Sequence, residues 1–96
     1  MRESKLQQEC IKNLKARGFY YINVHGGGWG AKGAPDLIAC INGRFVAFEL
    51  KVGDNEMQPA QRIHKTRIEV NGGLHFSPRT LEEFINIIEK IYKEDC

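Results

Sequence analysis

The sequence has no long apolar run, and its N-terminus carries no apolar segment. The first ten residues, MRESKLQQEC, are polar or charged at most positions. A secretory signal peptide needs an apolar stretch there, and a membrane-spanning helix needs about 20 consecutive apolar residues. We therefore expect no membrane association and a cytoplasmic location.

Cysteine is scarce and scattered. Cys10, Cys40 and Cys96 form no Cys-x-x-Cys pair, and an odd number argues against a disulfide scaffold. This usage fits a reducing compartment. A zinc site would need these residues clustered with histidines, and their spacing gives no such signal. We expect Cys40, on an apolar strand, to be a small core residue.

The size and composition fit one soluble domain spanning residues 1–96, with 42% apolar and 27% charged residues. Charge is uneven along the chain. Residues 1–67 hold eleven Lys or Arg against six acids, a net of +5, whereas residues 68–96 have a net of −3. The basic part suits a polyanionic partner, and a mixed solvated surface explains the charge equally well.

Hydrophobic periodicity predicts an α/β domain in the order α-β-β-β-α-β-α. Pro59 suits the first turn of the second helix, Asn71-Gly72-Gly73 suits its end, and Ser77 or Thr80 suits the cap of the third. The predicted helices cover residues 4–18, 57–70 and 77–93, and the predicted strands cover residues 19–25, 35–41, 44–51 and 74–77.

The dipeptide Asn42-Gly43 between two apolar strands predicts a tight hairpin. If these two residues form the turn, the register continues back to a pair of Asp36 with Glu49. Residues directly opposite each other have Cβ atoms about 4.5–5.5 Å apart on one face. Lys51 points to that same face because it lies two residues beyond Glu49.

Two opposed carboxylates destabilise a sheet unless something offsets their repulsion. A divalent cation can do so, since paired carboxylates with a backbone carbonyl and waters suit Mg²⁺ or Mn²⁺. The alternative is that Glu49 and Lys51 form an ion pair on a solvated strand face. A one-residue bulge would also break the alignment.

The motifs Gly33-Ala34-Pro35-Asp36 and Glu49-Leu50-Lys51, separated by a hairpin, resemble the PD-(D/E)xK nuclease signature. Glu3-Ser4-Lys5-Leu6-Gln7 before them and Pro59-Ala60-Gln61 after them resemble the VRR-NUC family in its small stand-alone viral and bacterial form. The likeness covers nearly the whole chain. It implies a restriction-endonuclease-like fold, with a mixed central sheet flanked by helices, in a bacterial or phage-infected cell.

By this resemblance, Asp36 and Glu49 would be metal ligands, with the backbone carbonyl of Leu50 completing the protein's share of the coordination. Lys51 would orient or activate the attacking water and stabilise charge on the phosphate.

The resemblance also assigns Gln61 to the catalytic group, near the metal or Lys51, and brings Glu3 toward the metal from the first helix. Glu3 lies on the apolar stripe of its helix, yet an acid in a first turn is also favoured by the helix dipole. Gln61 lies on a partly apolar stripe and would otherwise be a polar residue at the edge of the core.

The glycine-rich segment 26–34 satisfies G-x-G-x-x-G, but a strand follows it where a dinucleotide-binding loop would open a helix. We interpret it as a segment near DNA, in which Trp29 is either a stacking surface or a core anchor. The basic residues of the second helix would either touch the sugar-phosphate backbone or form a solvated face. The candidate DNA contacts are His25, Trp29, Lys32, Arg62 and Lys65.

Together these features predict a Mg²⁺-dependent DNA endonuclease, with Mn²⁺ able to substitute. Likeness to Holliday-junction resolvases implies branched DNA such as four-way junctions, and two symmetric nicks imply a C₂ homodimer. One alternative is a non-catalytic nucleic-acid-binding or assembly module with a nuclease-like fold. Another is a nuclease for linear, nicked or flapped DNA.

Overall fold

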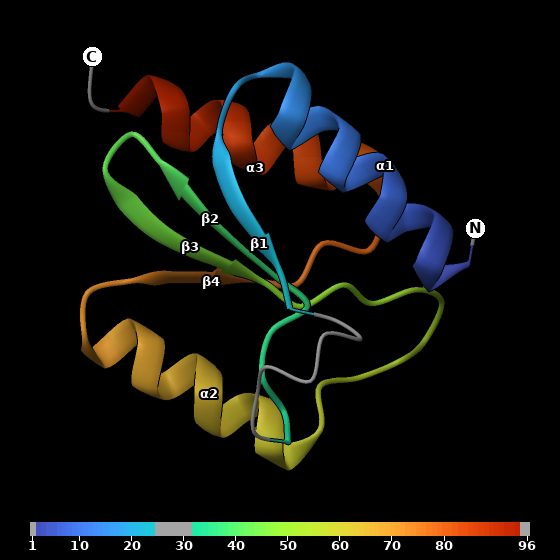
Figure 1. Ribbon diagram of the computed structural model, residues 1–96. Helices are drawn as coiled ribbons and strands as arrows, with labels where there is room; N and C mark the ends of the chain where they lie inside the picture. Colours follow the sequence, from blue (N-terminus) through green and yellow to red (C-terminus); the bar gives the residue numbers. More distant parts are fainter. Residues whose placement is uncertain (1, 25–31, 95–96) are drawn as a thin grey trace.

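A computed structural model describes residues 2–24 and 32–94, which form a four-stranded mixed sheet with helices on both sides (Figure 1). The strands lie in the order β1-β2-β3-β4, antiparallel except for the parallel pair β3–β4. The elements are α1 (Glu3–Ala16), β1 (Tyr20–Asn23), β2 (Leu37–Ile41), β3 (Arg44–Phe48), α2 (Pro59–Val70), β4 (Leu74–Phe76) and α3 (Leu81–Glu94). The predicted fold class and element order are confirmed.

The hydrophobic core lies between the sheet and the layer of α1 and α3. The predicted stripes are buried there: Leu6, Cys10 and Leu14 on α1, and Phe84, Ile88 and Ile91 on α3. Phe84 packs against Phe48 with ring centroids 4.7 Å apart. Truncation of such a buried ring to alanine typically costs about 3–5 kcal/mol of stability. These contacts hold the sheet that carries the polar site.

The hairpin between β2 and β3 has the predicted register, from Ile41 opposite Arg44 back to Leu37 opposite Phe48. Asn42 has φ 55° and Gly43 has φ 77°. Two positive φ angles are what a type I′ turn requires, and asparagine and glycine tolerate them best. The local turn chemistry therefore fixes the pairing of these strands.

The prediction that Asp36 pairs with Glu49 in this ladder is wrong, because the ladder ends one pair earlier. The Asp36 amide donates to the Phe48 carbonyl at 3.0 Å, one position out of register. The chain after Phe48 leaves β2 and continues beside β4, where the Glu49 amide donates to the Phe76 carbonyl at 2.9 Å. The two acids therefore approach each other just beyond the strands, and both strands are shorter than predicted.

Helix boundaries also differ by a few residues from the predicted ones. α1 ends at Ala16, and Gly18 follows with φ 73°. Pro59 is the first residue of α2, as predicted. Thr80 is the cap of α3, since its Oγ1 accepts a hydrogen bond from the Glu83 amide at 3.1 Å. Among the described residues, no helix has the length and apolar character that crossing a bilayer requires.

The second face of the sheet is covered by α2 alone, which packs chiefly on β4 (Figure 1). Every residue of α2 keeps some exposure in the described part of the chain. Cys40 lies on this face and is exposed, so the prediction that it is a core residue is wrong. Because its neighbours Ala39 and Ile41 face the core, alternation along the strand directs Cys40 outward.

Candidate functional site

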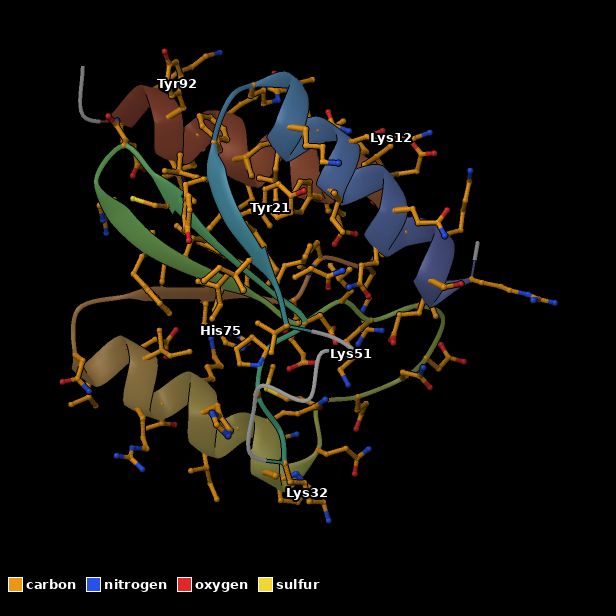
Figure 2. The ribbon with its side chains drawn as sticks, in the orientation of Figure 1. Lys12, Tyr21, Lys32, Lys51, His75 and Tyr92 are labelled. Carbon is orange, nitrogen blue, oxygen red and sulfur yellow. The ribbon has the colours of Figure 1, made fainter. Side chains whose placement is uncertain are left out.

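Three ionisable side chains are buried together where the chain leaves β3. Asp36 is 7% exposed, Glu49 is 3% exposed and Lys51 is 7% exposed. Lys51 lies where the strands converge, near the N-terminal half of α2 (Figure 2). Burial of charged groups is costly unless they are paired or bind an ion. This cluster is therefore the strongest candidate for a functional site in the described part of the chain.

Backbone contacts hold Asp36 on both sides. Its Oδ2 accepts a hydrogen bond from the Leu50 amide at 2.8 Å. Its own carbonyl accepts one from the Val24 amide at 2.9 Å, at the end of β1. The carboxyl group is thus fixed against the segment that carries Glu49, even though the regular ladder has ended.

Glu49 has a pKa raised from 4.5 to about 8. Burial is the main cause, followed by the negative charge of Asp36 and the contact between the two carboxyl groups. The positive charge of Lys51 acts in the opposite direction. Glu49 Oε1 is buried and has no hydrogen-bond donor among the described residues. A carboxylate with one buried oxygen left without a donor is suited to a cation.

Gln61 links the charged pair to α2. Its Nε2 donates to Glu49 Oε2 at 3.0 Å, and its Oε1 accepts from Lys51 Nζ at 2.8 Å. The same Oε1 accepts from the Gln58 amide at 2.8 Å, which completes a capping box at the start of the helix. One carboxamide therefore sets the orientation of Glu49 and Lys51 and the position of α2.

The donor set suits a hard cation. Asp36 and Glu49 supply carboxylate oxygens, and Leu50 lies beside them through its hydrogen bond to Asp36. Within residues 2–24 and 32–94, no group of three or more His, Cys, Asp or Glu side chains is arranged to hold a metal. Glu3 has a weak electrostatic effect on Glu49 and does not join such a group, so its role as a ligand stays a prediction. Two carboxylates with waters are typical of Mg²⁺ sites.

Gly33 explains how the chain reaches Asp36. Its φ is 87°, and a Cβ there would lie 2.6 Å from the backbone carbon of Ala60. Lys32, one residue earlier, has its carbonyl oxygen 3.2 Å from His64 Nε2. The segment before Asp36 therefore packs directly on the first turns of α2, and any side chain at position 33 would force it away. The sequence motif Gly33-Ala34-Pro35-Asp36 included this glycine, but the sequence did not show that contact with Ala60 is what requires it.

The predicted DNA contacts are only partly described. Lys32 and Arg62 are exposed, and Figure 2 shows Lys32 near the start of α2. Lys65 forms an ion pair with Glu69 at 2.8 Å. His25 and Trp29 lie outside the described residues. The structure thus gathers basic groups on and beside α2, the helix that also supplies Gln61 to Glu49.

Two buried polar residues beside the site were not assigned a role by the sequence. Gln7 on α1 donates through Nε2 to Asn23 Oδ1 at 2.6 Å, close to the Val24 amide that binds Asp36. The only signal for Gln7 was its position four residues after Glu3 on the same helix face.

His75 is the second such residue. It is buried on β4, directed toward α2 (Figure 2), and its two ring nitrogens have no hydrogen-bond partner among the described residues. Burial lowers its pKa, and the positive charge of Lys65 lowers it further. No sequence pattern distinguished this histidine from an ordinary strand residue.

The sequence matches no protein-family model and no curated protein at a significant level. Its structure is similar to two solved structures described as VRR_NUC domain proteins. One is 23% identical with a TM-score of 0.78, covering 94% of this chain and 97% of that one. The other is 22% identical with a TM-score of 0.81, covering 97% and 89%.

A third similar structure is Hjc, a Holliday junction resolvase from the archaeal hyperthermophile Archaeoglobus fulgidus. It is 20% identical with a TM-score of 0.53, covering 80% of this chain and 70% of that one. These likenesses confirm the fold that the sequence motifs predicted: the chain has the VRR-NUC fold.

Proposed function

We propose that this chain, with its VRR-NUC fold, is a metal-dependent endonuclease that hydrolyses phosphodiester bonds in DNA. The observation that carries the proposal is the buried pair Asp36 and Glu49 beside Lys51, with Glu49 Oε1 left without a donor. An ordinary structural ion pair would satisfy that oxygen. The basic groups near α2 support a polyanionic substrate.

Asp36, Glu49 and the Leu50 carbonyl would hold Mg²⁺, and Mn²⁺ would substitute for it. Bound there, the ion supplies a water of lowered pKa and offsets charge on the phosphate. The protein's contribution is to keep both carboxyl groups in place before the ion arrives, through the Leu50 amide on Asp36 and the Gln61 side-chain amide on Glu49.

Lys51 supplies a fixed positive charge next to this pair. Its ammonium group would orient the attacking water and stabilise the charge that develops on the phosphate. The hydrogen bond to Gln61 restrains it at 2.8 Å. This restraint reduces the reorganisation that the site needs during the reaction.

Branched DNA is the proposed substrate, in keeping with the similar structure described as a Holliday junction resolvase. A four-way junction requires two symmetric nicks, and one small domain with one site would deliver them as a C₂ homodimer. Sedimentation velocity, with and without a junction, measures that oligomeric state directly.

Cleavage assays on a panel of labelled DNAs test the function. The substrates are a four-way junction, a flap and a linear duplex, each with Mg²⁺, Mn²⁺ or EDTA. We expect cleavage of the junction with either metal, and we expect Asp36→Ala to abolish cleavage while retaining binding. A wild-type protein that binds DNA but never cuts it with either metal would establish the non-catalytic module instead. Preferred cleavage of the flap or linear duplex would establish that substrate class.

Gln61→Ala tests the positioning role of the bridging amide. We expect a fall of about 10-fold or more in the single-turnover cleavage rate at saturating DNA, with little change in Kd, because the lost contacts order the site and do not touch DNA. Gln8→Ala, an exposed glutamine on α1, is the matched control. A change confined to Kd would contradict the positioning role.

A further inference from the structure

An exposed apolar row crosses the open face of the sheet. Strand register places Tyr20, Cys40 and Phe45 side by side on β1, β2 and β3. Tyr20 is 70% exposed and Phe45 is 47% exposed. Monomeric proteins rarely expose aromatic side chains in a contiguous apolar surface unless that surface binds something. Neither residue has a role in the core or in the carboxylate site.

A cavity of about 540 Å³ adjoins this row, between Phe45 and the C-terminal part of α2. Its volume lies within the range of small-molecule sites. Its apolar walls are Phe45, Ile63 and Ile68, and the rest is lined by His64, Arg67, Asn71 and Gly73.

Gly73 keeps this cavity open. A Cβ at that position would lie 2.8 Å from Ile68 Cγ2 and 3.1 Å from Phe45 Cδ1. The hollow therefore depends on the absence of a side chain at this residue, just before β4.

The cavity lies on the same sheet face as the carboxylate pair. Phe45, Ala47 and Glu49 alternate with the core residues of β3, so all three point away from the core. Glu49 follows Phe45 by four residues, a distance of about 13 Å along an extended chain. This distance is short enough for one DNA strand to contact both the cavity and the carboxylate pair.

Charge favours nucleic acid over a second copy of the chain as the occupant. The Arg67 guanidinium at the cavity makes no hydrogen bond or ion pair with any described residue, and Arg62 lies exposed five residues earlier on the same helix. A symmetric contact between two copies at this face would bring these cations near their own counterparts, which is unfavourable. A phosphate next to a base would neutralise Arg67, and the ring of Phe45 offers a stacking surface.

We propose that this cavity receives an unpaired nucleobase of the DNA substrate, stacked on Phe45, with Arg67 on the neighbouring phosphate. The proposal rests on the nuclease function above and adds to it a reason for selecting branched or flapped DNA. An intact duplex presents no free base to the cavity, whereas a branch point or overhang does.

Fluorescence anisotropy in EDTA tests this, because binding is then measured without cleavage. The probes are a labelled blunt duplex and the same duplex with a short single-stranded overhang. We expect Phe45→Ala to weaken overhang binding by about tenfold, the usual effect of losing one base–aromatic stack, and blunt-duplex binding by less than about twofold. Phe45→Leu, which keeps an apolar side chain without the ring, should recover only part of the loss.

Arg67→Gln should weaken overhang binding several-fold and lower the slope of log K against log salt by about one. The matched controls are Val70→Ala, which truncates an exposed apolar residue of α2, and Lys15→Gln, which removes an exposed charge on α1. Both controls should bind like the wild type, and thermal melts establish that each variant is folded.

Equal losses for both probes, or full recovery of binding by Phe45→Leu, would overturn the stacking role. A shift from dimer to monomer in Phe45→Ala would overturn it in favour of a second copy of the chain. If the overhang preference is absent while blunt DNA is still bound and cut, the base cavity is refuted and the nuclease function stands. If the wild type binds neither probe, the base cavity is refuted, and cleavage of the four-way junction and the flap decides the nuclease function separately.

Discussion

Raising the pH in the absence of metal ions should destabilise this protein, because Glu49 is forced to ionise next to Asp36. The unfolded chain releases the Glu49 proton near the ordinary pKa of 4.5, whereas the folded protein retains it up to about 8. Between these values the native state binds more protons than the unfolded state. The contribution of Glu49 to stability therefore falls as the pH rises through this window, and this contribution is largest at the acid end.

The magnitude follows from the width of the window. Each pH unit between the two pKa values changes the free energy of unfolding by about 1.4 kcal/mol, so an increase from about pH 5.5 to 8 costs at most about 3 kcal/mol. Lys51 and partial access of water reduce that cost, and we expect on the order of 2 kcal/mol. For a domain of this size the fall in Tm is on the order of 10 °C.

Thermal melts followed by circular dichroism in EDTA, at several pH values from about 5.5 to 8.5, provide the assay. Glu49→Gln is the matched variant, since it keeps the shape of the side chain and cannot ionise. Its Tm should change little across the window and exceed that of the wild type at the alkaline end. Mn²⁺ should restore the wild type there and have little effect on the variant. Parallel pH profiles for the two proteins would refute the reasoning.

Three further substitutions test the surroundings of the site. Gly33→Ala should destabilise the fold and abolish activity, because its Cβ would clash with Ala60. Gly18 has a similar φ with open space around it, so Gly18→Ala should lower the free energy of unfolding by only about 1–2 kcal/mol, and thermal melts of the two variants test the difference. His75→Leu should remove the loss of stability that protonation of His75 causes below about pH 6.5, since burial lowers the pKa of this histidine and its protonation favours unfolding. If wild type and variant lose the same stability as the pH falls below about 6.5, this prediction is wrong. Thr80→Ala should lower the unfolding free energy by about 1 kcal/mol in urea titrations through loss of the α3 cap, and no change would show that the cap is dispensable.

Much of the fold was predictable because local signals agree with one another. Asn42-Gly43 permits the two positive φ angles of its turn, and that turn alone sets the register of β2 and β3. The apolar stripe of α3 has a period that only a helix can bury against a sheet. Cys40 shows the limit of such signals, since alternation placed it on the face that α2 leaves open.

The candidate site was predicted in its members but not in its geometry. The motifs identified Asp36, Glu49 and Lys51, and the resemblance added Gln61. The sequence could not show that Asp36 would bond to Phe48, one residue away from its predicted partner Glu49. This shift in register depends on the chain after β3 continuing beside β4. The sequence also gave no sign that a single amide would contact both Glu49 and Lys51, because α2 is distant in sequence and its position is set by packing.

The sequence by itself determined the order of the strands and helices, the hairpin turn and the charged residues that are candidates for the site, because periodicity and backbone preferences act over a few neighbouring residues. Tertiary structure alone decided which oxygen of Glu49 has no donor, how closely Gly33 approaches Ala60, and that a cavity opens beside Phe45. These features depend on where separate elements pack in space, and no short stretch of the chain contains that information.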